Sequence, residues 1–471
     1  MDETQLQQIV SRVVAEVRAK EGRPPAPGAA QAGVFPDVDS AVQAATAAFR
    51  QLRSMPLALR DKLISTIRQT IRAEARNLAY HARTETGLGR VEDKVEKNLL
   101  VANATPGTEI LRPAVITGDH GLTLTELAPF GVIGAITPST NPTSTIVNNT
   151  ISMVAAGNAV VFNAHPAAKG CSARTVELIN QAVVGVGGPP NLVACTAAPT
   201  IGSAQELMRH PGIRLLVVTG GPAVVDAAMG SGKRAICAGP GNPPAVVDET
   251  ADIPKAARDI VKGASFDNNV VCTDEKEIIV VASIADALIG ELKRNNVLMV
   301  GGHQLRQLEK ALFAQFPEPG CAGAMKKEFV GKNPSELMRA IGVTIGDDIR
   351  LLVAEVPREH PLVWTEQLMP ILPLVRVRTA EEAIDLGVAA EGGRLHTATM
   401  HSKNLDNLSR MAREINCSIF VKNGPNLAGL GYGGEGPTSF SIATPTGEGM
   451  TDARSFSRIR RCALIDAFRI V

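Results

Sequence analysis

From residue 130 onward, short apolar runs alternate with segments of helical periodicity, and this alternation constrains the fold more than any other feature. Short apolar strands separated by helices favour a parallel sheet covered by helices on both faces. Ligands of such sheets bind beyond the carboxyl ends of the strands, where TPSTNP, FNAHP and VTGGP lie. The expected strands are 131–138, 159–165, 192–197, 214–220 and 235–239, and the expected helices are 144–157, 171–184, 203–210 and 223–231.

Other parts of the chain show different patterns. Residues 36–112 are expected to be mostly helical, and 114–129 to form a β-hairpin that turns at Gly118–Asp119. A second α/β pattern is expected from about residue 240 to residue 424. The chain contains no GxGxxG, so the standard dinucleotide fingerprint is absent.

The first 35 residues predict a helix on a tether. Residues 1–20 carry apolar side chains at helical spacing, which indicates an amphipathic helix. Residues 21–35 are rich in Pro, Gly and Ala, which is typical of a flexible linker. The helix either packs back on its own domain or binds another protein, and the sequence leaves both alternatives open.

Composition excludes several classes of function. The 471 residues carry a net charge of +1, so no strong field attracts nucleic acid or an anionic membrane. Aromatic residues make up 3%, too few for platforms on which bases stack. No apolar run approaches the length of a membrane span, and the acidic start MDETQ does not resemble a secretory signal. We expect a protein of the cytoplasm that binds neither nucleic acid nor membrane.

Seven cysteines raise the question of their chemistry. Their number is odd and none forms a CxxC pair, so we expect a reducing compartment, no disulfide framework and no zinc site. His396 and His401 lie close in sequence but lack a third ligand nearby, so no metal site is expected there. Most free cysteines are buried and inert, which is the interpretation for Cys171, Cys195, Cys237, Cys417 and Cys462.

Cys272 is the candidate nucleophile. It follows the apolar pair Val270–Val271 and precedes a charged turn at residues 274–277, a setting that predicts a strand–loop junction. The alternative is a buried, inert cysteine. Cys321, in EPGCAGA, is the rival nucleophile.

Five stretches in order resemble the aldehyde dehydrogenase superfamily over roughly residues 36–471. They are ITPSTNPTST, GNAVVFNAHP, VTGGP, the segment of Cys272, and TEQLMPILP. The resemblance implies that Cys272 is the nucleophile and that Asn141 binds the oxyanion of the substrate. It implies an NAD site with a turn that meets the pyrophosphate and a carboxylate, Glu366, that holds the nicotinamide ribose. The cofactor-binding residues that it implies are Thr137, Pro138, Asn163, His165, Pro166, Thr219, Gly220, Gly221, Gly239 and Glu366.

One departure from the hydrolytic members of that family concerns water activation. Those members carry a glutamate in an ELGGK stretch, and the matching stretch here, CAGPGNPP, places Ala238 at that position. Alanine cannot activate water. The chain therefore resembles the CoA-acylating branch, in which coenzyme A takes the acyl group. TGLGRVEDKVEKN, SFDNNVVC and PTGEGMTDARSFSR are similar to the propionaldehyde and acetaldehyde dehydrogenases of bacterial microcompartments.

A second departure lies at the adenosine end of the cofactor. The family's lysine and glutamate around the adenine ribose are matched here by Asn163 and Pro166. Without the carboxylate, discrimination against a ribose phosphate should weaken. This fits one pocket that receives NAD and then CoA, and leaves some use of NADP open.

The resemblance also implies the architecture and the partners. We expect an α/β protein with a Rossmann-like NAD-binding domain, an α/β catalytic domain and a β-hairpin oligomerisation arm in a homodimer or homotetramer. The helix at the N-terminus resembles peptides that bind microcompartment shell proteins. The alternatives are a hydrolytic aldehyde dehydrogenase and a catalytically silent shell-binding protein. The expected domains are 36–113 with 130–238 for NAD, 239–445 for catalysis, and 114–129 with 446–471 for the arm.

Overall fold

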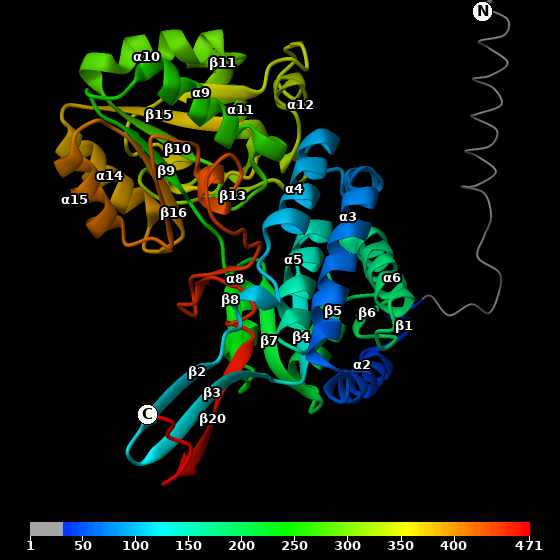
Figure 1. Cartoon of the computed structure of the whole chain (residues 1–471). Coiled ribbons are helices and arrows are strands. Elements are labelled where there is room, and N and C mark those ends of the chain that lie inside the picture. The colour runs from blue at the N-terminus through cyan, green and yellow to red at the C-terminus, as the bar shows by residue number, and fades with distance from the viewer. Residues whose placement is uncertain (1–31) are drawn as a thin grey trace, which may run out of the picture.

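The computed structural model describes residues 32–471, and it has two lobes and a projecting arm (Figure 1). The six-stranded lobe is built on the sheet order β1-β6-β5-β4-β7-β8, and all of its neighbouring strands are parallel. This confirms the sheet expected from the alternating pattern. Its strands are β1 Val34–Phe35, β4 Val132–Thr137, β5 Ala159–Ala164, β6 Val193–Thr196, β7 Ile213–Thr219 and β8 Ala235–Ala238.

Helices cover both faces of this sheet. Helices α5 and α6 pack together on one face, and α2 and α7 pack together on the other. Every residue of α5 is buried, because α3 and α4 cover its outer side. The helices are α2 Val38–Arg53, α3 Leu57–Thr86, α4 Val91–Ala104, α5 Pro142–Ala155, α6 Lys169–Gly185, α7 Ile201–Arg209 and α8 Pro222–Met229.

The seven-stranded lobe is the second α/β unit, with the order β11-β14-β15-β10-β9-β16-β17 and parallel pairing throughout. Helices α9 and α10 cover one face, and the others pack on the opposite face. Its strands are β9 Pro244–Val247, β10 Glu277–Val281, β11 Val297–Val300, β14 Leu351–Glu355, β15 Ile371–Val377, β16 Thr397–His401 and β17 Ile419–Lys422. Its helices are α9 Ile253–Ala264, α10 Ala282–Arg294, α11 Gly302–Leu312, α12 Pro334–Arg339, α13 Pro361–Trp364, α14 Ala380–Glu391 and α15 Leu405–Ile415.

The arm is an antiparallel sheet of β2 (Ala114–Gly118), β3 (Gly121–Pro129) and β20 (Ser457–Ile465), with β3 in the middle. The expected hairpin is present, but its turn lies one residue later than expected. Gly118 still pairs with Gly121, so Asp119 and His120 form the loop. Gly121 has a φ of +112°, a conformation open to glycine but strained for other residues.

Two expected boundaries are wrong. Val34 and Phe35 were expected in the linker, but they pair with β6 as the edge strand of the six-stranded sheet. The segment from Phe440 to Phe456 was expected to divide at residue 445 between the catalytic domain and the arm. Instead Phe440, Ala443, Ala453 and Phe456 all pack into the core of the six-stranded lobe. The sequence misses this because the segment has no long apolar run. The helix expected at 1–20 lies outside the described residues.

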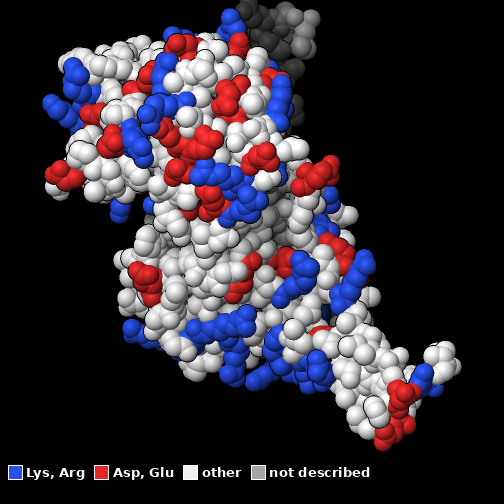
Figure 2. Space-filling view, turned by 90° about the vertical axis from the view of Figure 1, so that its left-hand side faces the viewer, with Lys and Arg blue, Asp and Glu red and all other residues white. Residues whose placement is uncertain are grey.

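The surface charge is mixed. Figure 2 shows both signs scattered over the seven-stranded lobe, an uncharged band below it, and a basic row along the lower edge of the six-stranded lobe. Between residues 32 and 471, no helix is both long and apolar enough to cross a membrane.

Candidate active site

Cys272 lies in a turn, where the sequence predicted a strand end. Val270 and Val271 do not form a strand. They follow α9 and the 3-10 turn Phe266–Asn269, and Cys272 comes five residues before β10. Asp267, Asn268 and Asn269 have φ angles of 45°, 56° and 66°, three left-handed residues in a row. This tight reversal places the partly exposed Cys272 against an apolar cluster that includes Phe266, Leu100 and Tyr432.

The four charged residues after Cys272 also differ from the prediction. Asp274, Glu275, Lys276 and Glu277 were interpreted as a charged turn, and all four are fully buried. The Lys276 ammonium donates to Asn269 O at 3.1 Å, Asn269 Oδ1 at 2.7 Å and Val271 O at 3.3 Å, so it stabilises the reversal that carries Cys272. Burial raises the pKa of Asp274 and Glu277 well above their usual range and that of Glu275 to about 8.

The residues around Cys272 come from the amino ends of four adjacent strands. Gly241 precedes β9, Cys272 precedes β10, Glu366 precedes β15 and His396 precedes β16, and these strands are neighbours in the order β15-β10-β9-β16. Gly241 N donates to Glu366 Oε1 at 3.3 Å. A Cβ on Gly241 would lie 2.7 Å from Cys272 O and 3.1 Å from the Cγ of His396. Gly241 therefore lies close to Cys272 and His396 and donates to Glu366, so it contacts the other three residues of this group.

The electrostatics of this site keep the thiol protonated in the free protein. Burial, and then the nearby Glu366 carboxyl, raises the pKa of Cys272 to about 12, while Lys276 acts in the opposite direction. Burial also raises the pKa of Glu366 and lowers that of His396 to about 3, so His396 is neutral at physiological pH. For Cys272 to react as a thiolate, the binding of substrate or of a cationic ring such as nicotinamide must therefore lower the pKa of its thiol.

Asn141 lies at the start of α5, as its N-cap residue, and is 8% exposed. Its Oδ1 accepts a hydrogen bond of 2.6 Å from the Nζ of Lys97, and its Nδ2 donates to Thr140 Oγ1 at 3.2 Å. Lys97 also pairs with Asp267, which lies in the reversal before Cys272. A single buried network therefore contacts the helix end that carries Asn141 and the segment that carries Cys272.

Ala238 is the last residue of β8 and is 4% exposed. Its carbonyl oxygen accepts a hydrogen bond of 3.1 Å from Gly220 N, which ties two adjacent strand ends together. Its methyl group cannot take a proton from water.

The candidate cofactor residues gather at the carboxyl edge of the six-stranded sheet. The chain runs from β4 outward to β5 and β6, then returns to β7 on the other side of β4, so this edge contains a topological switch point. They are Thr137 and Pro138 at the end of β4, Asn163, His165 and Pro166 at the end of β5, Thr219, Gly220 and Gly221 at the end of β7, and Gly239 after β8. Glu366 belongs instead to the seven-stranded lobe.

These residues fit a dinucleotide. The buried hydroxyl oxygen of Thr137 has no hydrogen-bond partner. Gly221 caps α8 without a side-chain hydrogen bond, and Pro222 has no N–H, so the N–H of Ala223 at the start of that helix is open to a pyrophosphate, while Val224 N and Val225 N donate to Gly221 O at 3.2 and 3.3 Å. Asn163 already accepts from Thr196 at 3.2 Å and from Ser203 at 2.7 Å, which leaves its NH₂ group for a ligand.

The pKa of His165, which lies at this edge, depends partly on a charge in the other lobe. Its exposed ring accepts a hydrogen bond from Ala167 N at 3.1 Å. Partial burial, and then the charge of Lys327 in the seven-stranded lobe, lowers the pKa of His165.

The other cysteines differ from Cys272 in burial. Cys171, Cys195 and Cys237 are buried as expected, and burial raises the pKa of Cys195 to about 12 and that of Cys237 to about 11. Cys417 is only partly buried, and Cys462 is exposed on β20, where a buried residue was expected. Cys321 is exposed. His396 and His401 are both buried, and within residues 32–471 no group of three His, Cys, Asp or Glu could hold a metal.

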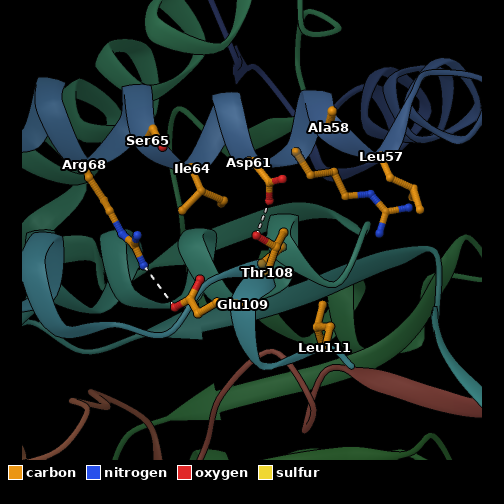
Figure 3. Close-up of a pocket in the computed structure, with 11 residues that line it drawn as sticks. Leu57, Ala58, Asp61, Ile64, Ser65, Arg68, Thr108, Glu109 and Leu111 are labelled. Atoms are coloured by element: carbon orange, nitrogen blue, oxygen red, sulfur yellow. Dashed lines mark hydrogen bonds and ion pairs between the residues drawn. The ribbon is translucent and has the colours of Figure 1, made fainter. Parts of the chain in front are cut away.

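A hollow of about 640 Å³ lies away from these residues, between α3 and residues 108–111 (Figure 3). Across it the Arg68 guanidinium faces the Glu109 carboxylate at 3.6 Å, and the Thr108 hydroxyl donates to Asp61. None of the candidate site residues lines it.

Two parallel sheets, each covered by helices on both faces, define the class as a two-lobed α/β protein. Residues 28–309 match the aldehyde dehydrogenase family. An acetylating acetaldehyde dehydrogenase of Salmonella typhimurium is 52% identical over 472 residues, with 100% of both chains covered. The chain belongs to the aldehyde dehydrogenase family.

Two solved structures are similar over nearly the whole chain. The propionaldehyde dehydrogenase of Rhodopseudomonas palustris, with bound CoA and an acylated cysteine, is 48% identical with a TM-score of 0.90, covering 93% of this chain and 99% of that chain. The propionaldehyde dehydrogenase of the Clostridium phytofermentans fucose utilisation microcompartment is 44% identical with a TM-score of 0.90, covering 93% and 100%.

Sequence reasoning missed the buried polar residues that support the site. Lys97, Asp267 and Lys276 are each at most 2% exposed, yet charged residues in such stretches usually face solvent. Gly241 carried one signal, since a glycine in the run GPGNPP indicates a special backbone position.

Proposed function

We propose that this protein oxidises a short-chain aldehyde with NAD and coenzyme A to acyl-CoA and NADH, through a thioester on Cys272. The observation that carries the proposal is Ala238 in place of a water-activating carboxylate, in a chain similar to an enzyme that holds CoA and an acylated cysteine. Propionaldehyde and acetaldehyde are the proposed substrates, in keeping with the names of the similar enzymes.

The first half-reaction forms the thioester. The Cys272 thiolate attacks the aldehyde carbon, a C–S bond forms, and the carbonyl oxygen becomes an oxyanion. The free N–H of the Asn141 amide and the backbone N–H of Cys272 donate to that oxygen, each typically contributing about 3 kcal/mol. NAD, when bound, supplies a nicotinamide carbon that accepts hydride from the former aldehyde carbon.

In that step the protein orients the cofactor relative to Cys272. The glycine turn at Gly220–Gly221 lets the pyrophosphate approach the backbone, and the N–H of Ala223 at the start of α8 would donate to it. Glu366 would hold the nicotinamide ribose near Cys272, since its carboxyl is fixed by Gly241 N. Thr137 and Asn163 offer a hydroxyl and an amide to the same ligand.

The second half-reaction transfers the acyl group. The CoA thiolate attacks the acyl carbon, the bond to Cys272 breaks, and the overall reaction releases one proton. One thioester replaces another, so this step is nearly balanced and the reaction is reversible. With Ala238 in the site, water has no general base at that position.

We propose a separate role for each of the two lobes. The six-stranded lobe binds NAD and then CoA, and the seven-stranded lobe carries the nucleophile. Because Asn163 and Pro166 offer no carboxylate to the adenine ribose, a phosphate there is tolerated, which suits CoA and permits some use of NADP.

The arm is the proposed oligomerisation element of a homodimer or homotetramer. Its exposed apolar side chains include Ile116 at 72%, Ile459 at 73% and Ile465 at 64%. Such a surface favours burial against another copy of the chain. Replacing Ile116 and Ile459 by Glu should lower the oligomeric state measured by sedimentation, and an unchanged state would contradict this role.

Residues 1–20 are the proposed signal that takes the enzyme into a cytoplasmic bacterial microcompartment by binding a shell protein. The support is their apolar stripe and the similarity to an enzyme of such a compartment. Deleting 1–20 should leave turnover nearly unchanged and abolish co-assembly with shell protein. Loss of activity on deletion, or normal encapsulation of the truncated enzyme, would contradict this proposal.

The alternatives are a hydrolytic dehydrogenase and a silent shell-binding protein. Product analysis with aldehyde, NAD and CoA separates all three. The proposal expects acyl-CoA and NADH in equal amounts, hydrolysis gives free acid, and a silent protein gives neither.

A further inference from the structure

We infer that Lys97 is a positioning residue that holds the Asn141 amide with its NH₂ group toward the substrate oxygen, an inference that rests on the proposed function. Lys97 lies on α4 and is 2% exposed. Its Nζ donates to Asn141 Oδ1 at 2.6 Å.

The chemistry of the two groups selects one orientation of the amide. An asparagine amide has an oxygen and a nitrogen of similar shape, so the side chain alone has two orientations. An ammonium group has donors and no acceptor, so Oδ1 must face Lys97. Nδ2 then points away, where one N–H bonds to Thr140 Oγ1 at 3.2 Å and the other is free for a ligand. With the opposite orientation the amide would present an oxygen to the oxyanion and repel it.

Asp267 anchors the ammonium. Its carboxylate accepts from Lys97 and, at 2.8 Å, from Lys94. Burial alone would raise the pKa of Asp267, but the two ammonium groups outweigh burial and hold it below its ordinary value. Burial lowers the pKa of Lys94 to about 8, against the attraction of Asp267. With both lysines charged, the three groups carry a net charge of +1 behind the amide.

Asp267 has an unfavourable backbone conformation that this network maintains. Its φ is 45°, and its Oδ1 accepts a hydrogen bond of 2.7 Å from Arg90 N. A left-handed conformation is costly for a residue other than glycine, and such strain gathers at functional sites. Because Asp267 comes five residues before Cys272, the network aligns the oxyanion donor of one lobe with the nucleophile of the other.

The test is a double-mutant cycle on the rate of the first NADH formed, which isolates the first half-reaction. Lys97→Met should lower this rate about 100-fold in the wild-type background, the loss typical of one oxyanion donor. In the Asn141→Ala background it should lower the rate less than threefold, because the amide it orients is gone. The matched comparison is Lys94→Met, which removes the other contact of Asp267 but touches Thr140 O rather than Asn141. Lys94→Met should cost the same factor in both backgrounds.

An equal loss from Lys97→Met in both backgrounds would overturn the inference, since a purely structural lysine acts independently of Asn141. If Lys97→Met does not fold, Lys97→Gln keeps a donor for Oδ1 and should retain most of the rate of the first NADH formed; a large loss that is equal in both backgrounds would overturn the inference. Failure of both variants to fold would also overturn the positioning role. A wild-type enzyme that forms no acyl-CoA would instead defeat the proposed function, so the two failures are distinguishable.

Discussion

The α-carbon of Gly241 faces the carbonyl oxygen of Cys272 so closely that a Cβ on Gly241 would lie 2.7 Å from that oxygen. The same residue donates its N–H to Glu366 at 3.3 Å. Gly241 lies in the stretch that also contains Ala238, where the sequence departs from the hydrolytic pattern. One short segment therefore supplies the close packing beside the nucleophile and lacks the base that would activate water.

Gly241→Ala should displace the turn that carries Cys272. A backbone oxygen cannot move as a flexible side chain does, and overpacking typically costs about 1–3 kcal/mol. We expect a fall of at least about tenfold in kcat/KM and a lower melting temperature. The control is Gly290→Ala on α10, where a Cβ meets no atom within 4 Å and helix propensity improves. Full activity of Gly241→Ala would show that the contact is not needed.

Cys272→Ala should abolish acyl-CoA formation, because none of the other six cysteines lies at the amino ends of the four central strands. Cys321→Ala should retain activity, since Cys321 is exposed. The assay is acyl-CoA formation at saturating aldehyde, NAD and CoA. Substantial activity of Cys272→Ala would remove the assignment of the nucleophile.

Alkylation of Cys272 should report its raised pKa. With a pKa of about 12, the thiolate fraction increases roughly tenfold per pH unit between pH 7 and 9. The rate of modification by iodoacetamide should increase by that factor when it is measured without NAD in a background with both exposed cysteines removed, Cys321→Ala and Cys462→Ala. A thiol of ordinary pKa would level off near pH 9.

Glu366→Gln should accelerate this alkylation several-fold, because a negative neighbour that disfavours the thiolate is removed. The same variant should lower turnover with NAD if Glu366 holds the nicotinamide ribose. An unchanged rate of alkylation would show that Glu366 does not act on the thiol.

Glu275→Gln should stabilise the protein selectively at high pH. Glu275 is fully buried and its folded pKa is about 8, above its ordinary 4.5, so the folded chain keeps a proton that the unfolded chain releases in between. The free energy of unfolding therefore falls as pH rises through that window. The neutral amide removes this loss, which is roughly 2–4 kcal/mol at pH 8 and small at pH 5.

Melting temperatures at pH 5 and pH 8 measure this effect. The exposed Glu435→Gln is the control and should show no difference between the two pH values. An equal change for Glu275→Gln at both pH values would mean that burial does not retain the proton.

The sequence predicts the parallel sheet of the first lobe because burial on two faces leaves a direct signature, short continuous apolar strands between helices. For the second lobe it predicts the α/β pattern but not the pairing of the strands. It also predicts the hairpin of the arm, since alternation and turn residues are local features. Cys272 could be found through a resemblance, but its surroundings could not. Val270 and Val271 indicate a strand, yet the buried Lys276 holds the chain in a reversal there.

The sequence does not indicate which charged residues are buried. Lys97 and Asp267 are 170 positions apart, and only the packing of α4 against the reversal brings them together. Each alone is typical of a solvated surface. Phe440 and Phe456 are missed for a related reason, since the segment between them joins the six-stranded lobe through contacts that are distant in sequence.

Stopped-flow measurement of NADH formation with aldehyde and NAD, with and without CoA, tests the central claim most directly. Without CoA we predict a burst of at most one NADH per active site, followed by slow leakage, because Ala238 cannot activate water to release the acyl group from Cys272. Added CoA should restore continuous turnover with one acyl-CoA formed per NADH. Rapid multiple turnover to free acid without CoA would contradict the account.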